Sequence, residues 1–207
     1  KRSARPSTGF PITCSGDMDI LNATFPHILN SENATIFIGG DLLRGTGTAV
    51  FNYNWSTVVF NGTGTQTLAA STALYDLVLS HTGTFALAGN LRTLSDFTIN
   101  SGTLDFSGFD VDSVMGNFQV NNGSSSTFAG LAGRTIKVHG NATLNGQAGD
   151  SLSLNTGTDH YIDITGSLNA DLAIIGHSNA GGGSTGIPSS NCRSAGNNTN
   201  WDFDETA

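Results

Sequence analysis

Six side chains in the sequence could carry out acid–base chemistry on a sugar. They are Asp105, Asp110 and Asp112, followed later in the chain by Asp159, His160 and Asp163. Paired carboxylates cleave glycosidic bonds when they flank the bond at a fixed separation. The two groups are expected to lie about 10 Å apart, two strand spacings, if they face the same side. The simpler interpretation is that these are solvated acids on an outer face or at corners, so we predict no catalytic residue.

Metal binding and nucleophilic catalysis have little support in the sequence. The five histidines lack the spacing of metal ligands, and we expect surface or corner positions for all of them: His27, His81, His139, His160 and His177. Serine is abundant, but no G-x-S-x-G elbow occurs. Calcium is the ion that suits an acidic, oxygen-rich surface, yet the G-G-x-G-x-D repeat of calcium-binding β-rolls is missing. We predict no cofactor and no metal site, with calcium the one ion left open.

Composition excludes two classes of partner. The chain has 207 residues, 16 acidic against 8 basic side chains and a formal net charge of −8. Nucleic-acid binding depends on clustered lysine and arginine, which this sequence lacks. No apolar run approaches the ~18 residues that span a bilayer, so we expect no membrane span. The length is sufficient for one sizeable core and does not require a second domain.

A repeat of about 25 residues runs through the chain. Its marker is a glycine followed by a small or polar residue and then, in most copies, an apolar one. The glycines are Gly40, Gly64, Gly89, Gly116, Gly140 and Gly166. The positions four and two residues before each glycine are mostly apolar, as in Ile36 and Ile38 or Ile162 and Ile164. An apolar residue at every second position is typical of a strand with one buried face.

A fixed repeat of short strands predicts a right-handed parallel β-helix, or β-solenoid, of about six coils with ~25 residues per coil. An antiparallel β-sandwich also has short strands between glycine-rich turns, but its strands need not keep a constant period. The interval before Gly116 is two residues too long, and Asp112 falls there at a position that is otherwise apolar. We therefore expect a bulge or a longer corner between Gly108 and Asp112.

The ends of the chain differ from its middle. We predict an extended arm over residues 1–17, the solenoid over 18–178 and a loop-rich tail over 179–207 that carries Trp201 and Phe203. A solenoid exposes unpaired strand edges at its ends, where another chain can add. Trp201 and Phe203 are therefore candidate contacts in an assembly of identical copies.

Cys14 and Cys192 are the only cysteines, and one lies near each end. They suit an oxidising environment, and we consider a disulfide between them, within one chain or between neighbouring copies, beside two free thiols. Seven Asn-x-Ser/Thr sequons are candidate glycosylation sites, a slight excess over chance: Asn22, Asn33, Asn54, Asn61, Asn122, Asn141 and Asn197.

Several phrases resemble the β-solenoid repeats of large secreted bacterial surface proteins, the adhesin-like and filamentous-haemagglutinin-like group found in Bacteroidetes. They are VFNGTGTQTL at residues 59–68, LAGNL at 87–91 and FTINSGTLD at 97–105. The similarity covers roughly residues 35–175, and residues 192–203 look like the end of such an array. The resemblance implies an extracellular, non-catalytic scaffold, and it transfers no functional residue.

Three functions remain open after these observations. The chain is expected to be an extracellular structural protein at the cell surface, a filament or sheath subunit that self-associates through its solenoid ends. The alternative is an adhesin module that binds glycans or a host surface. A polysaccharide-active β-helix enzyme is the third, and we predict that the chain is not an enzyme.

Overall fold

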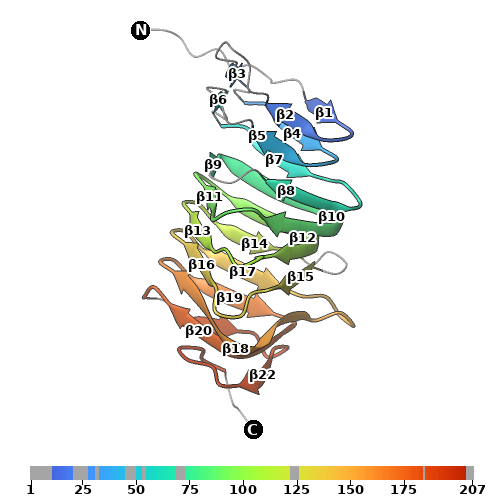
Figure 1. Ribbon diagram of the computed structural model, residues 1–207. Helices are drawn as coiled ribbons and strands as arrows, with labels where there is room; N and C mark the ends of the chain where they lie inside the picture. Colours follow the sequence, from blue (N-terminus) through green and yellow to red (C-terminus); the bar gives the residue numbers. More distant parts are fainter. Residues whose placement is uncertain are drawn as a thin grey trace, which may run out of the picture.

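The computed structural model forms a tapered rod built only from β-strands in its described part (Figure 1). It describes residues 11–20, 28–30, 33–44, 50–52, 55–68, 73–121, 126–183 and 185–203. Within these residues there is no helix, and the strands of all three sheets pair in parallel. This arrangement confirms the prediction of a parallel β-solenoid.

The backbone winds around three faces, and each face stacks one short strand per coil. Face 1 is the longest continuous row of pairings. It contains β1 (Ile12–Cys14), β4 (Thr35–Ile38), β7 (Thr57–Phe60), the first part of β10 (Asp76–Leu87), the first part of β12 (Phe97–Asp105), β14 (Phe118–Val120), β17 (Ala142–Asn145), β19 (Leu168–Asp171) and β21 (Gly186–Pro188).

Face 2 follows face 1 in each coil, and several strands bend around the corner to reach it. It contains β2 (Met18–Ile20), β5 (Leu42–Arg44), β8 (Thr65–Leu68), the second parts of β10 and β12, β15 (Ser126–Ala129), the first parts of β18 (Leu152–Ile164) and β20 (Ala173–Gly181), and β22 (Arg193–Gly196).

Face 3 closes the coil and carries the site described below. It contains β9 (Ala73–Leu74), β11 (Leu91–Thr93), β13 (Val111–Val114), β16 (Thr135–Val138) and the second parts of β18 and β20. At the N-terminal end, β3 (Ile28–Asn30) and β6 (Val50–Asn52) pair with each other in a separate two-stranded sheet.

The coils are shorter and more numerous than the glycine series predicts. The structure has about seven turns spaced ~21 residues apart, and the register varies widely around that spacing. Leu168 pairs with Gly186 only 18 residues later, whereas Ala142 pairs with Leu168 after 26 residues. Loop length at the corners is therefore not constant, and the apparent 25-residue period is an average over different corners.

The glycine series mixes the three corners of the coil. Gly116, Gly140 and Gly166 share the corner between faces 3 and 1, where the N–H of each later glycine donates to the carbonyl of the glycine before it. Gly40 instead lies between β4 and β5, and Gly89 lies between β10 and β11. Because each corner of a three-sided coil is followed by a strand with the same inward alternation, sequence spacing alone cannot distinguish them.

Local strand predictions agree with the structure. Residues Thr35–Ile38 alternate between half-buried and buried side chains, as the apolar pattern indicates. The bulge expected near Asp112 is also confirmed, because Leu91 pairs with Val111 but Arg92 pairs with Ser113. Asp112 is the additional residue, and its side chain is exposed.

The core is a set of inward columns in which like residues stack from coil to coil. One column on face 1 is continuous through seven coils: Ile36, Val58, Leu77, Phe97, Phe118, Ala142 and Leu168. Phe97 and Phe118 stack with their ring centroids 5.1 Å apart. Burying each aromatic side chain contributes about 1.5–3 kcal/mol, so these columns supply the main stabilisation of the rod.

Side-chain oxygens satisfy backbone donors at the corners. Between faces 3 and 1, the Oδ1 atoms of Asp96, Asn117 and Asn141 accept hydrogen bonds from the N–H groups of Asn117, Asn141 and Ser167, respectively. Each contact joins one coil to the next. Buried or partly buried backbone donors need such partners, which explains why aspartate and asparagine follow the corner glycines.

The stack extends beyond both predicted boundaries of the solenoid. Ile12–Cys14, within the predicted arm, pairs with β4. In the predicted tail, β21 and β22 pair with β19 and β20, so they belong to the final coils. The strand signal at both ends is only three or four residues long, which is too short to recognise without its pairing partner. Residues 1–10 of the predicted arm lie outside the described residues.

Candidate functional site

The acids at positions 105, 110 and 112 lie at corners of the coil and on the outer surface of face 3. Asp105 Oδ1 accepts a hydrogen bond from the N–H of Ser107, 2.9 Å away. Asp110 Oδ1 accepts one from the N–H of Thr135 on the next coil. Both carboxylates therefore act as corner acceptors. Asp112 lies on the outer surface of face 3, with Oδ2 3.7 Å from Nε of Arg92 on β11.

The second group of candidates is dispersed by the fold. Asp159 is exposed, and its Oδ1 lies 3.2 Å from Nδ1 of His177. The neighbouring His160 points into the core and is fully buried. Asp163 lies on the outer surface of face 3. Because successive residues of a strand point to opposite sides, His160 cannot reach a substrate that contacts Asp159 and Asp163 on the outer surface.

The prediction that all histidines lie at the surface is wrong for two of them. His81 and His160 both occupy inward positions, and burial lowers the pKa of each. For His160 the pKa falls to about 4, chiefly because burial disfavours the charged ring. Nε2 of His160 has no hydrogen-bond partner. His139 is exposed, His177 is half-buried, and His27 lies outside the described residues.

The outer surface of face 3 contains a shallow hollow of about 260 Å³. It is lined by Thr135, Tyr161, Asp163, Asn179 and Gly181, from three successive coils. The hollow forms where Gly181 follows Asp163 in the stack and places no side chain on the surface. A β-carbon at Gly181 would come no closer than 3.5 Å to Asp163 Oδ1, so the open space there is real and could be filled.

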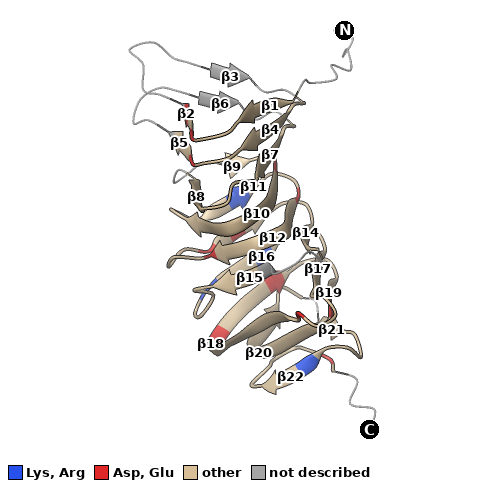
Figure 2. Cartoon of the chain, turned by 90° about the vertical axis from the view of Figure 1, so that its right-hand side faces the viewer, with Lys and Arg blue, Asp and Glu red and all other residues tan. Residues whose placement is uncertain are grey.

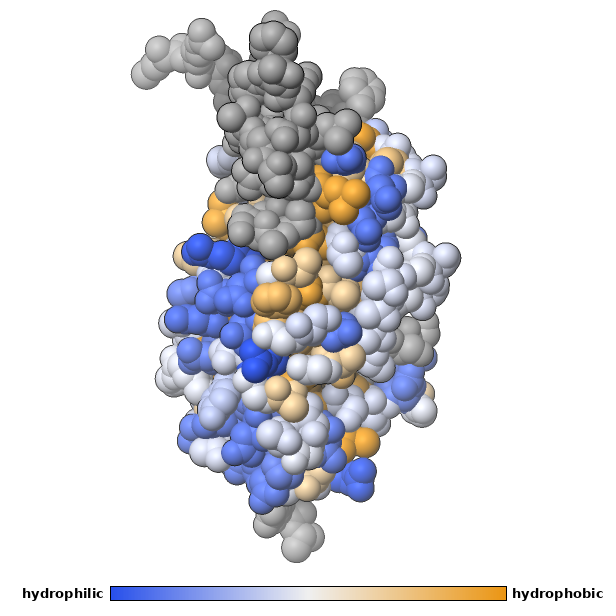
Figure 3. Space-filling view, in the orientation of Figure 1, coloured by the Kyte–Doolittle hydropathy of each residue, from blue (hydrophilic) through white to orange (hydrophobic). Residues whose placement is uncertain are grey.

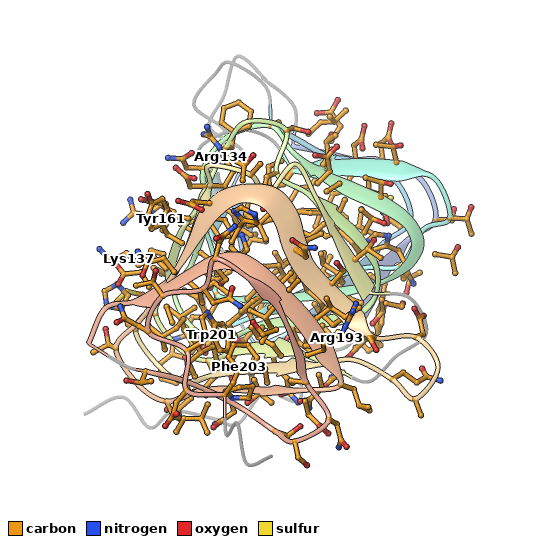
Figure 4. The ribbon with its side chains drawn as sticks, turned by 90° about the horizontal axis from the view of Figure 1, so that it is seen from below. Arg134, Lys137, Tyr161, Arg193, Trp201 and Phe203 are labelled. Atoms are coloured by element: carbon orange, nitrogen blue, oxygen red, sulfur yellow. The ribbon has the colours of Figure 1, made fainter. Side chains whose placement is uncertain are left out.

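Register alone brings these groups together. Thr135 pairs with Tyr161, which pairs with Asn179, giving one outward column. Lys137 pairs with Asp163, which pairs with Gly181, giving the column beside it. Seen from below, Arg134, Tyr161 and Lys137 lie on the same outer side of the rod (Figure 4).

The hollow combines an aromatic ring with several hydrogen-bonding groups. Tyr161 is 46% exposed, which is unusual for a large aromatic side chain in this protein. Asp163 can accept hydrogen bonds, while Asn179 and Thr135 can donate and accept them. Lys137 is exposed, and within the part of the chain that the structure describes it forms no ion pair and makes no hydrogen bond. An apolar ring face beside converging polar groups suits a ligand that has both C–H surfaces and hydroxyl groups.

Basic groups concentrate on and around this face. Arg92 lies on β11, and Arg134 and Lys137 both belong to the coil of β16, two coils further along, while acidic residues are distributed along the rod (Figure 2). Arg134 Nη1 donates to the carbonyl of Gly108, and Arg92 contacts Asp112, so only Lys137 keeps its cation free among these three.

The two cysteines are free and lie at opposite ends of the rod. Cys14 is in β1, and Cys192 lies between β21 and β22. Eight strand spacings separate β1 from β21, which is about 38 Å. A disulfide needs Cα atoms within ~7 Å, so the structure excludes a bond between Cys14 and Cys192 of the same chain.

The other predicted sites are spread over the surface. Four sequon asparagines are exposed: Asn33, Asn61, Asn141 and Asn197. The remaining three, Asn22, Asn54 and Asn122, lie outside the described residues. Trp201 and Phe203 pack against the core at the C-terminal end, where the Trp201 ring covers Gly186 (Figure 4). Their predicted role in assembly stays a prediction.

The described residues offer neither a cluster of metal ligands nor a membrane-spanning helix. No group of three or more histidine, cysteine or acidic side chains is placed to hold a metal ion there. The described part also contains no helix with the length and apolar character needed to cross a bilayer.

The sequence analysis missed Thr135, Tyr161 and Asn179 as site residues. A signal was present, because Thr-x-Lys at residues 135–137 and Tyr-x-Asp at 161–163 occupy equivalent outward positions one coil apart. Comparison with protein-family models, curated proteins and solved structures finds no match to this chain.

Proposed function

We propose that this chain is an extracellular solenoid module that binds saccharides through the hollow on face 3. The observation that carries the proposal is the exposed ring of Tyr161 beside the polar groups of Asp163 and Asn179. Sugars present alternating C–H faces and hydroxyl edges, and such ligands pack on aromatic rings while their hydroxyls bond to carboxylate and amide groups.

The scaffold favours binding because the site is built on strands. Tyr161, Asp163 and Asn179 project from β18 and β20, whose hydrogen-bonded register fixes their spacing. A rigid site loses little conformational entropy when a ligand binds. The extracellular location is supported by the resemblance of the repeats to bacterial surface proteins and by a composition poor in lysine.

Binding to immobilised cellulose, xylan, chitin, pectate and alginate tests this function. The wild-type chain is expected to bind at least one of these polysaccharides, and Tyr161→Ala is expected to weaken that binding at least tenfold because the ring supplies the apolar contact. Gly181→Val should weaken it similarly, since the new side chain fills the hollow without removing a polar group.

The matched control is Ile187→Ala. Ile187 is 56% exposed but belongs to β21 of face 1, so its removal should leave binding unchanged. The proposal fails if the wild type binds none of the five polysaccharides, or if the Tyr161 and Gly181 variants bind as tightly as the control.

A second function, a filament or sheath subunit, is favoured by the positions of the cysteines. Head-to-tail stacking of two copies would bring Cys192 of one copy to the end where Cys14 of the next is located. Within the described residues, β1 pairs only with β4, so a strand edge faces that end of the rod. Parallel strand addition at such an edge is a known route to open polymers.

Electrophoresis without reducing agent tests the filament. Oxidised wild-type protein is expected to form a ladder of multimers that a thiol reductant collapses to monomer. Cys14→Ser should run as monomer, because head-to-tail contact then leaves Cys192 without a cysteine to bond. Oxidised wild-type protein that runs entirely as monomer would count against this second function.

A further inference from the structure

A row of apolar side chains, three of them exposed and one half-buried, runs along the corner between faces 3 and 1. We call Trp55, Tyr75, Leu94 and Met115 the apolar corner row. Trp55 is 70% exposed, Met115 50% and Leu94 45%. Most of the surface in Figure 3 is hydrophilic or neutral in colour. Exposed apolar groups that cluster mark a binding surface more often than scattered ones do.

The row has one member per coil. The N–H of Leu94 donates to the carbonyl of Leu74, and the N–H of Met115 donates to that of Thr93, so equivalent corner positions stack directly. Tyr75, Leu94 and Met115 each follow the last residue of a face 3 strand. Successive members are therefore spaced by ~4.8 Å along the rod axis. This spacing is close to the length of one sugar residue in an extended polysaccharide.

An aromatic stack begins the row. The rings of Trp55 and Tyr75 lie nearly parallel, with an interplanar angle of 11° and centroids 5.9 Å apart. Trp55 has a φ of 65°, in the left-handed region that a bulky side chain rarely adopts. Residues held in such a conformation are often functional. The strained backbone thus holds the Trp55 side chain in a position where most of its surface is exposed to water.

The width of the apolar corner row favours a polysaccharide over a protein as its ligand. It is one side chain wide, and the polar acceptors Asp96 and Asn117 of the corner lie next to it. A stable protein partner needs a broad interface of about 800 Å² on each side, which a single row does not supply. A chain one sugar ring wide fits the width of the row, and its hydroxyls match the polar groups beside it.

We propose that a linear polysaccharide lies along the apolar corner row, one sugar ring per coil, and continues across face 3 to the hollow at Tyr161. The inference rests on the proposed saccharide-binding function and specifies its ligand as a long linear chain. From Trp55 to the coil of Tyr161 the ligand passes Leu94, Met115 and the free cation of Lys137. A short oligosaccharide reaches only the hollow.

The length dependence of binding tests the inference. Trisaccharide and polymer forms of the same five polysaccharides are titrated against the full chain, and tryptophan fluorescence is recorded. The polymer that binds is expected to bind at least tenfold more tightly than its trisaccharide, since the extra rings gain additional contacts. Trp55→Ala should reduce polymer affinity about tenfold and leave trisaccharide affinity unchanged.

Fluorescence provides a second readout. The chain has two tryptophans, and Trp201 lies at the C-terminal end, away from the row. Polymer binding should therefore change the emission of the wild type and leave that of Trp55→Ala unchanged. Tyr161→Ala should weaken the binding of both the trisaccharide and the polymer, which separates the hollow from the row.

Three results would overturn the inference. Equal affinity for trisaccharide and polymer would show that nothing beyond the hollow is contacted. Unchanged polymer binding by Trp55→Ala would show that the apolar corner row does not contact the polysaccharide, and it would leave the proposed saccharide-binding function intact. Absence of binding to every trisaccharide and polymer would refute the proposed function and this inference together.

Discussion

Replacing Gly62 with alanine is expected to destabilise the solenoid by about 3 kcal/mol, in the range of strain that overpacking produces. A β-carbon at Gly62 would lie 2.1 Å from the carbonyl oxygen of Gly39 on the preceding coil. That oxygen belongs to the backbone, so no side-chain rotation can relieve the contact. The coils would have to separate locally, at the expense of the hydrogen bonds between them.

The corner cannot easily move, because a buried glutamine holds it. Gln66 is almost fully buried, and its Oε1 accepts a hydrogen bond from the N–H of Gly62. Its Nε2 donates to the carbonyls of Ile38 and Gly40 on the coil before. The side chain thus joins two coils, and shifting Gly62 would disturb these bonds together.

Gly64→Ala is the matched control. Gly64 is exposed at the same corner, its φ is not in the left-handed region, and a β-carbon there would meet nothing within 4 Å. The change should be neutral or stabilising by up to about 1 kcal/mol, because alanine restricts the unfolded chain. Urea unfolding followed by circular dichroism measures both variants. Equal midpoints for the two would contradict the close packing of coils at Gly62.

The stability of the wild-type protein is expected to fall by about 2 kcal/mol between pH 7.5 and pH 5 through His160 alone. In the folded chain, burial holds the pKa of His160 at about 4, whereas an unfolded histidine has a pKa near 6.5. Between these values the unfolded state binds more protons than the folded state. The stabilisation is therefore complete above pH 6.5 and is lost as the pH falls toward 4.

The environment of His160 explains why protonation is so unfavourable. The ring lies in the core opposite Ser178, with Nδ1 3.3 Å from Oγ1 of Thr156. Asp159 precedes it and opposes the shift, but its carboxylate is exposed and burial has the larger effect. His81 is also buried with a lowered pKa, so it adds to the effect in the same direction.

His160→Leu tests this source of pH dependence. The variant should lose about 2 kcal/mol less than the wild type between pH 7.5 and pH 5, because leucine takes up no proton. His139→Leu is the control, since it removes an exposed imidazole in place of a buried one. Urea unfolding at the two pH values measures the difference. Parallel losses in the wild type and the His160 variant would show that His160 does not carry the effect.

The sequence by itself determined the strands and the class of fold. The alternation of residues such as Thr35–Ile38 predicts which side chains point into the core and which point outward. The structure has the same alternation, because each strand buries its own apolar residues. The glycines and the asparagines that follow them mark corners for the same local reason. A chain with this pattern at repeated intervals can bury its apolar residues only by stacking, which is why the solenoid is predictable.

Only the tertiary structure decided which coils and faces lie beside one another. Coil lengths vary from 18 to 26 residues, and all three faces share one inward alternation, so spacing in the sequence does not assign a residue to a face. The buried positions of His81 and His160 do not depend on that assignment, because they continue the local alternation of Leu77 and Leu79 and of Ile162 and Ile164. The meeting of Tyr161 with Thr135 and Asn179 does depend on it, because these residues are joined only by backbone pairing between coils. The local sequence encodes whether a side chain points in or out, whereas its neighbours are set by hydrogen bonds between segments about twenty residues apart.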